Sequence, residues 1–476
     1  FDIKQVEMKS FIEDEKQCLR ITSDFLNATI LGKITLSSIA NNFLHIVHTE
    51  VPNISSLQRD TKLSGNNFTF EANIEPIDQL SKVLLWDIST KEPTFIQGSF
   101  NDFTNIFSIN AQSKGIQLNK NYLYFATIDL HNSTSGIDLD ANVGLKMPKD
   151  SLLVNVTSKI LNNQGNTSIS WKNSYGKEFN GKLESVLDIK KNEDNEVETN
   201  IHILPTEMVV NDSIWHITNS TLVYKKERLL FDKFAITQHD KFIRINGIAS
   251  KLEDDWLYVD INQFNLEYLS ELLQLKGIHL SGIATGSITA QQAFNKPILN
   301  ASINATDFGL NSAPFGNVEV TANYNYEKEQ IDIEGLITNH KLQQSHVSGY
   351  ISPVRNDMLL RADMYEVNVK FLDPYLSSFA KDIEGEATGV IYIGGDLRAI
   401  EVWGKAFINK AKLHIDYLKT DVYFSDYITL TKNSILLSDI TIADKKGNKG
   451  TVNGKITHKA FSEFLFNIDL LLKNML

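Results

Sequence analysis

Apolar and polar residues alternate with a period of two through most of this 476-residue chain. A clear example is the run in which Leu257, Val259 and Ile261 alternate with Tyr258 and Asp260. Alternation of this kind is typical of strands with one buried face. Because it recurs between short polar turns, it predicts a mainly β protein built from sequential antiparallel strands.

The strand pattern belongs to an internal repeat. Segment 280–288 (Leu-Ser-Gly-Ile-Ala-Thr-Gly-Ser-Ile) aligns with 383–391 (Ile-Glu-Gly-Glu-Ala-Thr-Gly-Val-Ile) at an offset of 103 residues. A fixed period predicts an elongated stack of similar units, each with about six or seven strands of ordinary length. The expected divisions are a diverged β-repeat region at 1–199, repeats at 200–300 and 301–403, and a truncated repeat at 404–476 leading into a missing C-terminal domain.

Four segments depart from period two and carry apolar residues at helical spacing. They are 36–47, 77–85, 264–273 and 369–379. Pro374 suits the first turn of a helix. We expect short amphipathic helices at the edge or the mouth of the sheet.

The inward positions of the repeat are apolar and often small. Small residues fill a closed core poorly, and few helices are predicted to cover so long a sheet. We therefore expect a curled antiparallel sheet that forms an open half-pipe with a hydrophobic interior. The simpler alternative is that the apolar face packs a closed core, as in most antiparallel sheets. The predicted groove-lining residues are Leu257, Val259, Ile261, Ala284, Ile288, Leu299, Ala301, Ile303, Val318, Val320, Leu360, Ala362, Met364, Ala387, Ile391, Val402, Ala406 and Ile408.

Composition narrows the choice of partners. The net charge is −12, and lysine and arginine are scattered rather than clustered, which argues against a nucleic-acid partner. The single cysteine, Cys18, cannot form an internal disulfide. No apolar run is long enough to cross a bilayer. The chain begins at Phe1 and ends in a strand pattern at Leu476, so we expect it to be a piece of a longer protein.

Signals for catalysis are weak. His45, His48 and Glu50 could share one helical face, but two histidines alone specify a metal site loosely. Gly394 and Gly395 lie between strand patterns and fit a turn better than a phosphate loop, which needs a following helix. We predict no catalytic residue, no metal and no cofactor, and do not expect an enzyme.

Three stretches resemble a known family. They are 383–397 (Ile-Glu-Gly-Glu-Ala-Thr-Gly-Val-Ile-Tyr-Ile-Gly-Gly-Asp-Leu), 402–413 (Val-Trp-Gly-Lys-Ala-Phe-Ile-Asn-Lys-Ala-Lys-Leu) and 440–458 (Ile-Thr-Ile-Ala-Asp-Lys-Lys-Gly-Asn-Lys-Gly-Thr-Val-Asn-Gly-Lys-Ile-Thr-His). They look like the repeated strand unit of the TamB proteins, in the AsmA-like group of diderm bacterial envelopes. The composition, rich in Asn, Lys and Ile, resembles Bacteroidota members.

The resemblance implies a periplasmic half-pipe anchored in the inner membrane through a segment that is not in this chain. It implies phospholipid as cargo and an outer-membrane β-barrel partner of the BamA or TamA type. An alternative from a different class is a scaffold or chaperone for the assembly of outer-membrane proteins. A closed β-sandwich adhesin or stalk is a third possibility. No catalytic residue carries over.

Overall fold

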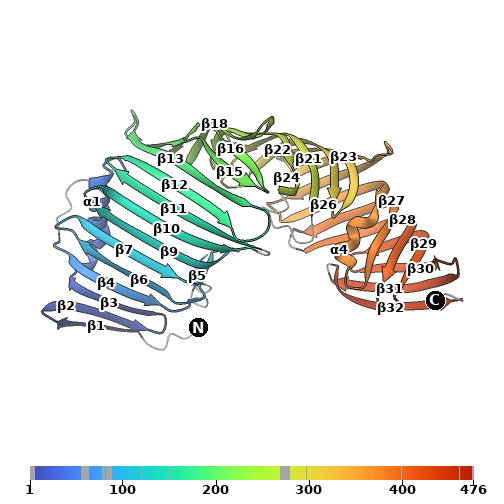
Figure 1. Cartoon of the computed structure of the whole chain (residues 1–476), viewed down its shortest axis with the longest axis horizontal. Coiled ribbons are helices and arrows are strands. Elements are labelled where there is room, and N and C mark those ends of the chain that lie inside the picture. The colour runs from blue at the N-terminus through green and yellow to red at the C-terminus, as the bar shows by residue number, and fades with distance from the viewer. Residues whose placement is uncertain are drawn as a thin grey trace. The chain divides into compact units, whose positions relative to one another are not determined.

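A computed structural model gives the fold of the chain as two compact units, Phe1–Gln238 (the N-terminal unit) and His239–Leu476 (the C-terminal unit). The structure describes residues 6–54, 64–77, 81, 88–118, 121–147, 150–268, 279–295, 297–397, 399–459 and 461–473. Both units consist mostly of antiparallel strands, with a few short helices (Figure 1). The predicted mainly β, antiparallel fold class is confirmed.

The N-terminal unit is one antiparallel sheet, in which most strands pair with the next strand in the chain. Exceptions are the pairs β4–β6, β5–β8, β7–β9, β13–β15, β14–β17 and β16–β18. Its strands are β1 (Val6–Glu13), β2 (Lys16–Ser23), β3 (Leu26–Lys33), β4 (Asn67–Ile74), β5 (Ile88–Thr90), β6 (Thr94–Asn101), β7 (Ile106–Ser113), β8 (Ile116–Leu118), β9 (Asn121–Ser133), β10 (Gly136–Lys146), β11 (Ser151–Leu161), β12 (Gln164–Asn173), β13 (Phe179–Lys191), β14 (Val197–Ile203), β15 (Thr206–Val210), β16 (Ser213–Ile217), β17 (Ser220–Lys225) and β18 (Arg228–Gln238).

The C-terminal unit is a simple meander in which each strand pairs with the next. Its strands are β19 (Lys241–Ala249), β20 (Leu257–Asn265), β21 (Leu280–Gln291), β22 (Ile298–Leu310), β23 (Ala313–Asn325), β24 (Gln330–Thr338), β25 (Gln344–Ser352), β26 (Asp357–Asn368), β27 (Ala380–Asp396), β28 (Ala399–Ile415), β29 (Thr420–Thr431), β30 (Ser434–Ala443), β31 (Lys449–Lys459) and β32 (Ser462–Leu472).

The sequence repeat corresponds to a block of six strands. Segment 280–288 lies in β21, and its copy at 383–391 lies in β27. The repeat boundaries expected at 200, 301 and 404 fall inside β14, β22 and β28, whereas the two units divide between Gln238 and His239. The two units therefore divide at a turn between strands. The expected repeat boundaries describe the sequence alignment and do not coincide with this division.

Two of the predicted helical segments are helices. Segment 36–47 forms η1 (Leu36–Ser38) and α1 (Ile39–Glu50), and segment 369–379 forms η2 (Val369–Leu372) and α4 (Asp373–Leu376), with Pro374 in the first turn of α4. Segment 77–85 lies mostly outside the described residues, and segment 264–273 is described only as far as residue 268, with 264–265 in β20 and helical backbone at 267–268.

Both helical segments pack on the apolar face of a sheet. In the N-terminal unit, Ile46 of α1 is fully buried against Phe68, Phe100 and Phe107. In the C-terminal unit, Leu372 and Leu376 pack against a cluster made of Val369, Ile383, Ala387 and Ala406. Apolar side chains at helical spacing therefore cover part of each apolar face, as expected for amphipathic helices.

Five β-bulges of one kind recur in the described strands of the C-terminal unit. At each bulge the cross-strand register shifts, and one residue has a left-handed φ near +50°. Its backbone N–H donates to a polar side chain of the following strand. Bulges bend a strand and increase its twist, so together they curl this sheet. The bulge residues and their acceptors are Gln263 with Thr285, Asp307 with Asn317, Glu366 with Thr388, Lys410 with Ser425, and Asp439 with Asn453.

Candidate functional site

A continuous row of apolar residues crosses every strand of the C-terminal unit. Residues that are directly paired across an antiparallel ladder lie on the same face of the sheet. Following these pairs from β19 to β32 gives one apolar residue or glycine per strand, without a polar interruption. The members of this long apolar row are Ile243, Ile261, Gly286, Ile303, Val320, Gly335, Val347, Ala362, Ile391, Gly404, Leu430, Ile435, Ile456 and Phe466.

A second row runs beside the long apolar row. On each strand its member lies two residues from the member of the long apolar row, always on the same side of that row. It crosses β19 to β28 and is again entirely apolar or glycine. Its members are Ile245, Val259, Ile288, Ala301, Ala322, Ile333, Gly349, Leu360, Ile393 and Val402. The two rows make this face a band of apolar surface rather than a single line of side chains.

No second sheet buries this band in the described part of the C-terminal unit. Ile261, Ile303 and Val320 are half-buried, although a closed sandwich would bury such central side chains fully. Full burial on this face occurs under η2 and α4, at Ala284, Ala290 and Ala305, and in a cluster on β29–β31 made of Val422, Ile440, Ile442 and Val452. The larger side chains of the two rows from β19 to β26 keep partial access to solvent.

The structure brings all eighteen predicted groove-lining residues onto this one face. Ten of them belong to the two rows just described. The other eight flank the rows through the cross-strand sets Leu257–Ala290–Leu299, Ala284–Ala305–Val318, Met364–Gly389–Ala406 and Ala387–Ile408. Sequence reasoning missed the later members Leu430, Ile435 and Ile456, which show the same alternation.

The N-terminal unit carries a comparable row that sequence reasoning did not identify. It crosses β1–β4, β6, β7 and β9–β13, and most of its members are half-buried. The signal in the sequence was again period-two alternation, but no repeat alignment connected the strands. The members are Met8, Ile21, Ala28, Ala72, Ile96, Ala111, Ile128, Ala141, Val156, Ile169 and Leu183.

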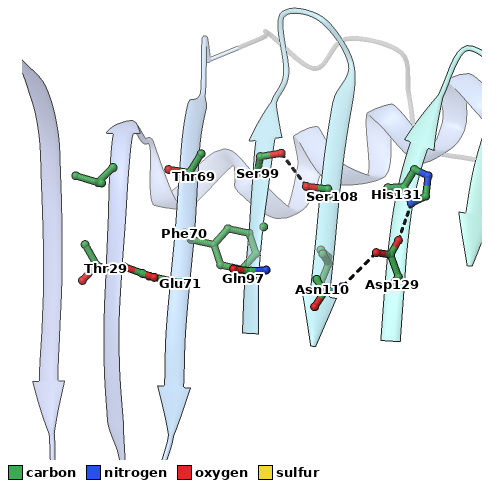
Figure 2. A pocket seen from close by; sticks show the side chains of 13 residues that line it. Thr29, Thr69, Phe70, Glu71, Gln97, Ser99, Ser108, Asn110, Asp129 and His131 are labelled. Carbon is green, nitrogen blue, oxygen red and sulfur yellow. Dashed lines mark hydrogen bonds and ion pairs between the residues drawn. The ribbon is translucent and has the colours of Figure 1, made fainter. Parts of the chain in front are cut away.

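The opposite face of the N-terminal sheet is polar and holds a shallow depression of about 660 Å³. Figure 2 shows its lining side chains on neighbouring strands, with a helix behind the sheet. One cross-strand row in it consists of Thr29, Glu71, Gln97, Asn110 and Asp129. Each of these residues is a direct chain neighbour of a member of the apolar row, so it points away from that row.

Several polar side chains in this depression form hydrogen bonds with one another. The imidazole of His131 lies 2.7 Å from Asp129, and Asn110 donates to the same carboxylate at 3.2 Å. Those hydrogen bonds, the one with His131 foremost, lower the pKa of Asp129. Ser108 is the cross-strand partner of His131, but its hydroxyl is bonded to Ser99 at 2.8 Å. Serine, histidine and aspartate are thus present without the serine–histidine hydrogen bond of a hydrolytic triad.

Other candidate chemistry is sparse among the described residues. They contain no group of three or more His, Cys, Asp or Glu residues placed to hold a metal ion. His45 and His48 lie on α1. Cys18 is a free, buried thiol whose pKa is raised by burial, which is typical of an inert cysteine. None of the described helices has the length and apolar character needed to cross a membrane.

No family model, no curated protein and no solved structure matches the chain.

Proposed function

We propose that this chain is a bridge-like carrier that conducts phospholipids between two membranes along its apolar faces. The observation that carries the proposal is the long apolar row, which passes through all strands from β19 to β32 without a polar residue. The resemblance to TamB proteins supports the same function, with the periplasm as the place and an outer-membrane β-barrel protein as the partner.

The energetics favour such a surface for acyl chains. Exposing a lipid tail to water costs about 0.8 kcal/mol per methylene, so two tails of about sixteen carbons cost roughly 25 kcal/mol. Contact with a continuous apolar band removes much of that cost. The head group can stay in water, since the band is open to solvent along most of its length.

The regular spacing of the row suits movement as well as binding. Neighbouring strands lie about 4.8 Å apart, so equivalent apolar positions follow one another in small steps. Members such as Gly286, Ala362 and Gly404 are small, which leaves room above the sheet. Similar sites in series avoid one deep binding site from which a lipid could not leave.

Photo-crosslinking tests the proposal with matched neighbours on opposite faces. A photoreactive residue at Val259, Ile303 or Ala406 is expected to capture phospholipid from cells, because these positions lie on the apolar face. The neighbours Asp260, Ser302 and Lys405 are the controls, since each differs by one position and faces the other way. Equal capture at both sets, or capture at the controls alone, would overturn the proposal.

A second variant separates folding from transport. Ile303→Asp places a charge in the long apolar row, whereas Ser302→Asp places it on the polar face of the same strand. We expect both proteins to fold and only Ile303→Asp to block phospholipid transfer. Normal transfer by folded Ile303→Asp would contradict an apolar path through this row.

The alternative function, guiding outer-membrane proteins, has one specific observation in its favour. Among the described residues, β32 pairs with a single strand, β31, and its large side chains Leu465, Phe466, Leu470, Leu471 and Leu472 are exposed. An open edge can pair with a strand of another chain. Crosslinks from β32 to protein substrates, together with no lipid at Ile303, would favour this function.

A further inference from the structure

Three phenylalanines form a bridge across the apolar face of the C-terminal unit. The ring of Phe379 lies 5.0 Å from the ring of Phe464 and 5.0 Å from that of Phe466, measured between ring centroids. The interplanar angles are 70° and 79°, close to the edge-to-face arrangement that aromatic pairs prefer. Phe379 thus contacts both rings in a favourable geometry. We refer to these three residues as the aromatic bridge.

The bridge joins strands that are distant in the sheet. Phe379 directly precedes β27, whereas Phe464 and Phe466 belong to β32. Five strand-to-strand steps separate β27 from β32, which would be about 24 Å in a flat sheet. Ring contact at 5.0 Å therefore requires this part of the sheet to curl back toward itself. The bulges at Lys410 and Asp439, on β28 and β30, lie between the two strands and supply bending.

The bridge also lies on the proposed path. Phe466 is the last member of the long apolar row, and Phe464 points to the same face of β32. On the other side, Phe379 follows α4, which packs on the apolar face over Ala387 and Ala406. Anything that moves along the row as far as β32 meets these rings at Phe466.

Both ends of the bridge are anchored separately. The N–H of Phe379 donates to Leu376 O at 3.0 Å, and its carbonyl accepts from Asp416 N at 3.2 Å. On β32, Phe464 is within 6.0 Å of the ring of His458, which stacks on Phe461. No backbone hydrogen bond among the described residues joins the two anchors. The contacts of Phe379 with β32 are made by its ring, and Phe466 is half-exposed.

We propose that Phe379, with Phe464 and Phe466, is a gate that closes the apolar path in the C-terminal unit and opens by swinging one aromatic side chain away. The gate rests on the proposed function, since it regulates the same path. A gate needs backbone that is held firmly on both sides and a contact between the sides that is made by side chains. The rings can then separate without unfolding a strand. In the closed state acyl chains are held below the rings or excluded.

Phospholipid transfer by the full chain tests the gate. Donor vesicles carry a fluorescent phosphatidylethanolamine, and its arrival in acceptor vesicles is measured over time. Phe379→Ala removes both ring pairs and is expected to speed transfer several-fold. Phe103→Ala is the matched control, because Phe103 is 82% exposed in a turn of the N-terminal unit, and it should leave the rate unchanged. Phe379→Leu keeps apolar bulk without the edge-to-face geometry and should lie between them.

A crosslink that holds the gate closed should have the opposite effect on phospholipid transfer. In a Cys18→Ser background, Phe379→Cys and Phe466→Cys are combined, and the two thiols are joined by a cleavable bifunctional maleimide. Transfer should fall when the pair is joined and return when the linker is cleaved. Circular dichroism of each variant verifies the fold.

The outcomes separate the gate from the proposed function. If a photoreactive residue at Ile303 captures lipid but neither Phe379→Ala nor the joined pair changes transfer, the gate is wrong and the proposed function stands. If Ile303 captures no lipid in the parent chain or in Phe379→Ala, the proposed function fails and the gate fails with it.

Discussion

Thr285 accepts a hydrogen bond from the backbone N–H of Gln263 at 3.0 Å, across the β20–β21 pair. Thr388 accepts one from Glu366 at the same distance, 103 residues later in the chain. Both donors have a left-handed φ at a bulge, where the ladder leaves an N–H without a strand partner. The repeated Ala-Thr-Gly thus conserves a bulge as well as a strand, and through the bulge it conserves curvature.

The bulge hydrogen bond can be tested with Thr285→Val. Loss of the acceptor leaves the Gln263 N–H without its partner, and we expect a cost of about 1 kcal/mol in local stability. Thr289→Val is the control, because Thr289 lies on the same strand and the same face. Hydrogen exchange at the Gln263 amide should become faster in Thr285→Val only. Equal exchange in both variants would show that the hydroxyl does not hold the bulge.

Glycine at position 349 is required by the close approach of the neighbouring strand. Its φ is +145°, and a Cβ there would lie 2.0 Å from the carbonyl oxygen of Leu359. Gly335 on the adjacent strand has ordinary space, with the nearest atom 3.5 Å from its Cβ position. Two glycines on one apolar face therefore differ in the reason for their presence.

This contrast predicts different effects of the same substitution. Gly349→Ala should destabilise the C-terminal unit by about 1–3 kcal/mol, since strain or a shift of β26 must follow. Gly335→Ala should be neutral or slightly stabilising, because alanine restricts the unfolded chain. Denaturant unfolding of the two variants against the parent measures the difference. A destabilisation of Gly335→Ala as large as that of Gly349→Ala would contradict the steric argument.

The sequence predicted the strands and the apolar face well, because both depend on a local period of two. Val259, Ile303 and Ala406 were assigned to one face from alternation alone, and register places them there. The bulges were not predicted, since a residue such as Gln263 carries no local sign of a left-handed φ. The aromatic bridge could not be predicted either, because Phe379 and Phe466 meet only through the curl of five intervening strand pairs.

The hydrogen bonds to Asp129 predict a dependence on pH with a defined sign. His131 and Asn110 lower the pKa of Asp129 in the folded protein, so the charged form is favoured by folding. The resulting stabilisation is complete above the ordinary pKa of an aspartate and is lost as the pH falls through the lowered value. The effect on stability should be small, since the side chain is about half-exposed.

NMR titration of the Asp129 carboxyl group measures this directly. We expect its pKa to move up toward the usual range in His131→Ala and, by less, in Asn110→Ala. Ser99→Ala is the control, because Ser99 lies in the same depression and is bonded to Ser108. An unchanged pKa of Asp129 in His131→Ala would show that the histidine does not stabilise the carboxylate.

A buried polar contact fixes α1 on the apolar face of the N-terminal unit. Asp102 accepts from Asn42 of α1 at 2.6 Å and from Asn66 at 3.1 Å, and all three side chains are at most 1% exposed. Asn66 in turn accepts from the N–H of Thr35, just before η1, at 2.6 Å. The helix is therefore held by directed hydrogen bonds in addition to the packing of Ile46.

Asn42→Ala should weaken the attachment of α1 to the sheet by more than the loss of a small side chain alone would. The substitution removes a donor from a buried carboxylate, and leaving such a group undersatisfied costs about 1–3 kcal/mol or more. Asn41→Ala is the matched control, since Asn41 is the preceding residue of the same helix and is exposed. Hydrogen exchange of the α1 amides should rise strongly in Asn42→Ala and stay near the parent value in Asn41→Ala. If lipid occupies the apolar face, the loosened helix should also expose Phe68 and Phe100 beneath it to photo-crosslinking. Unchanged protection of the α1 amides in Asn42→Ala would refute the role of Asp102 as the anchor of α1.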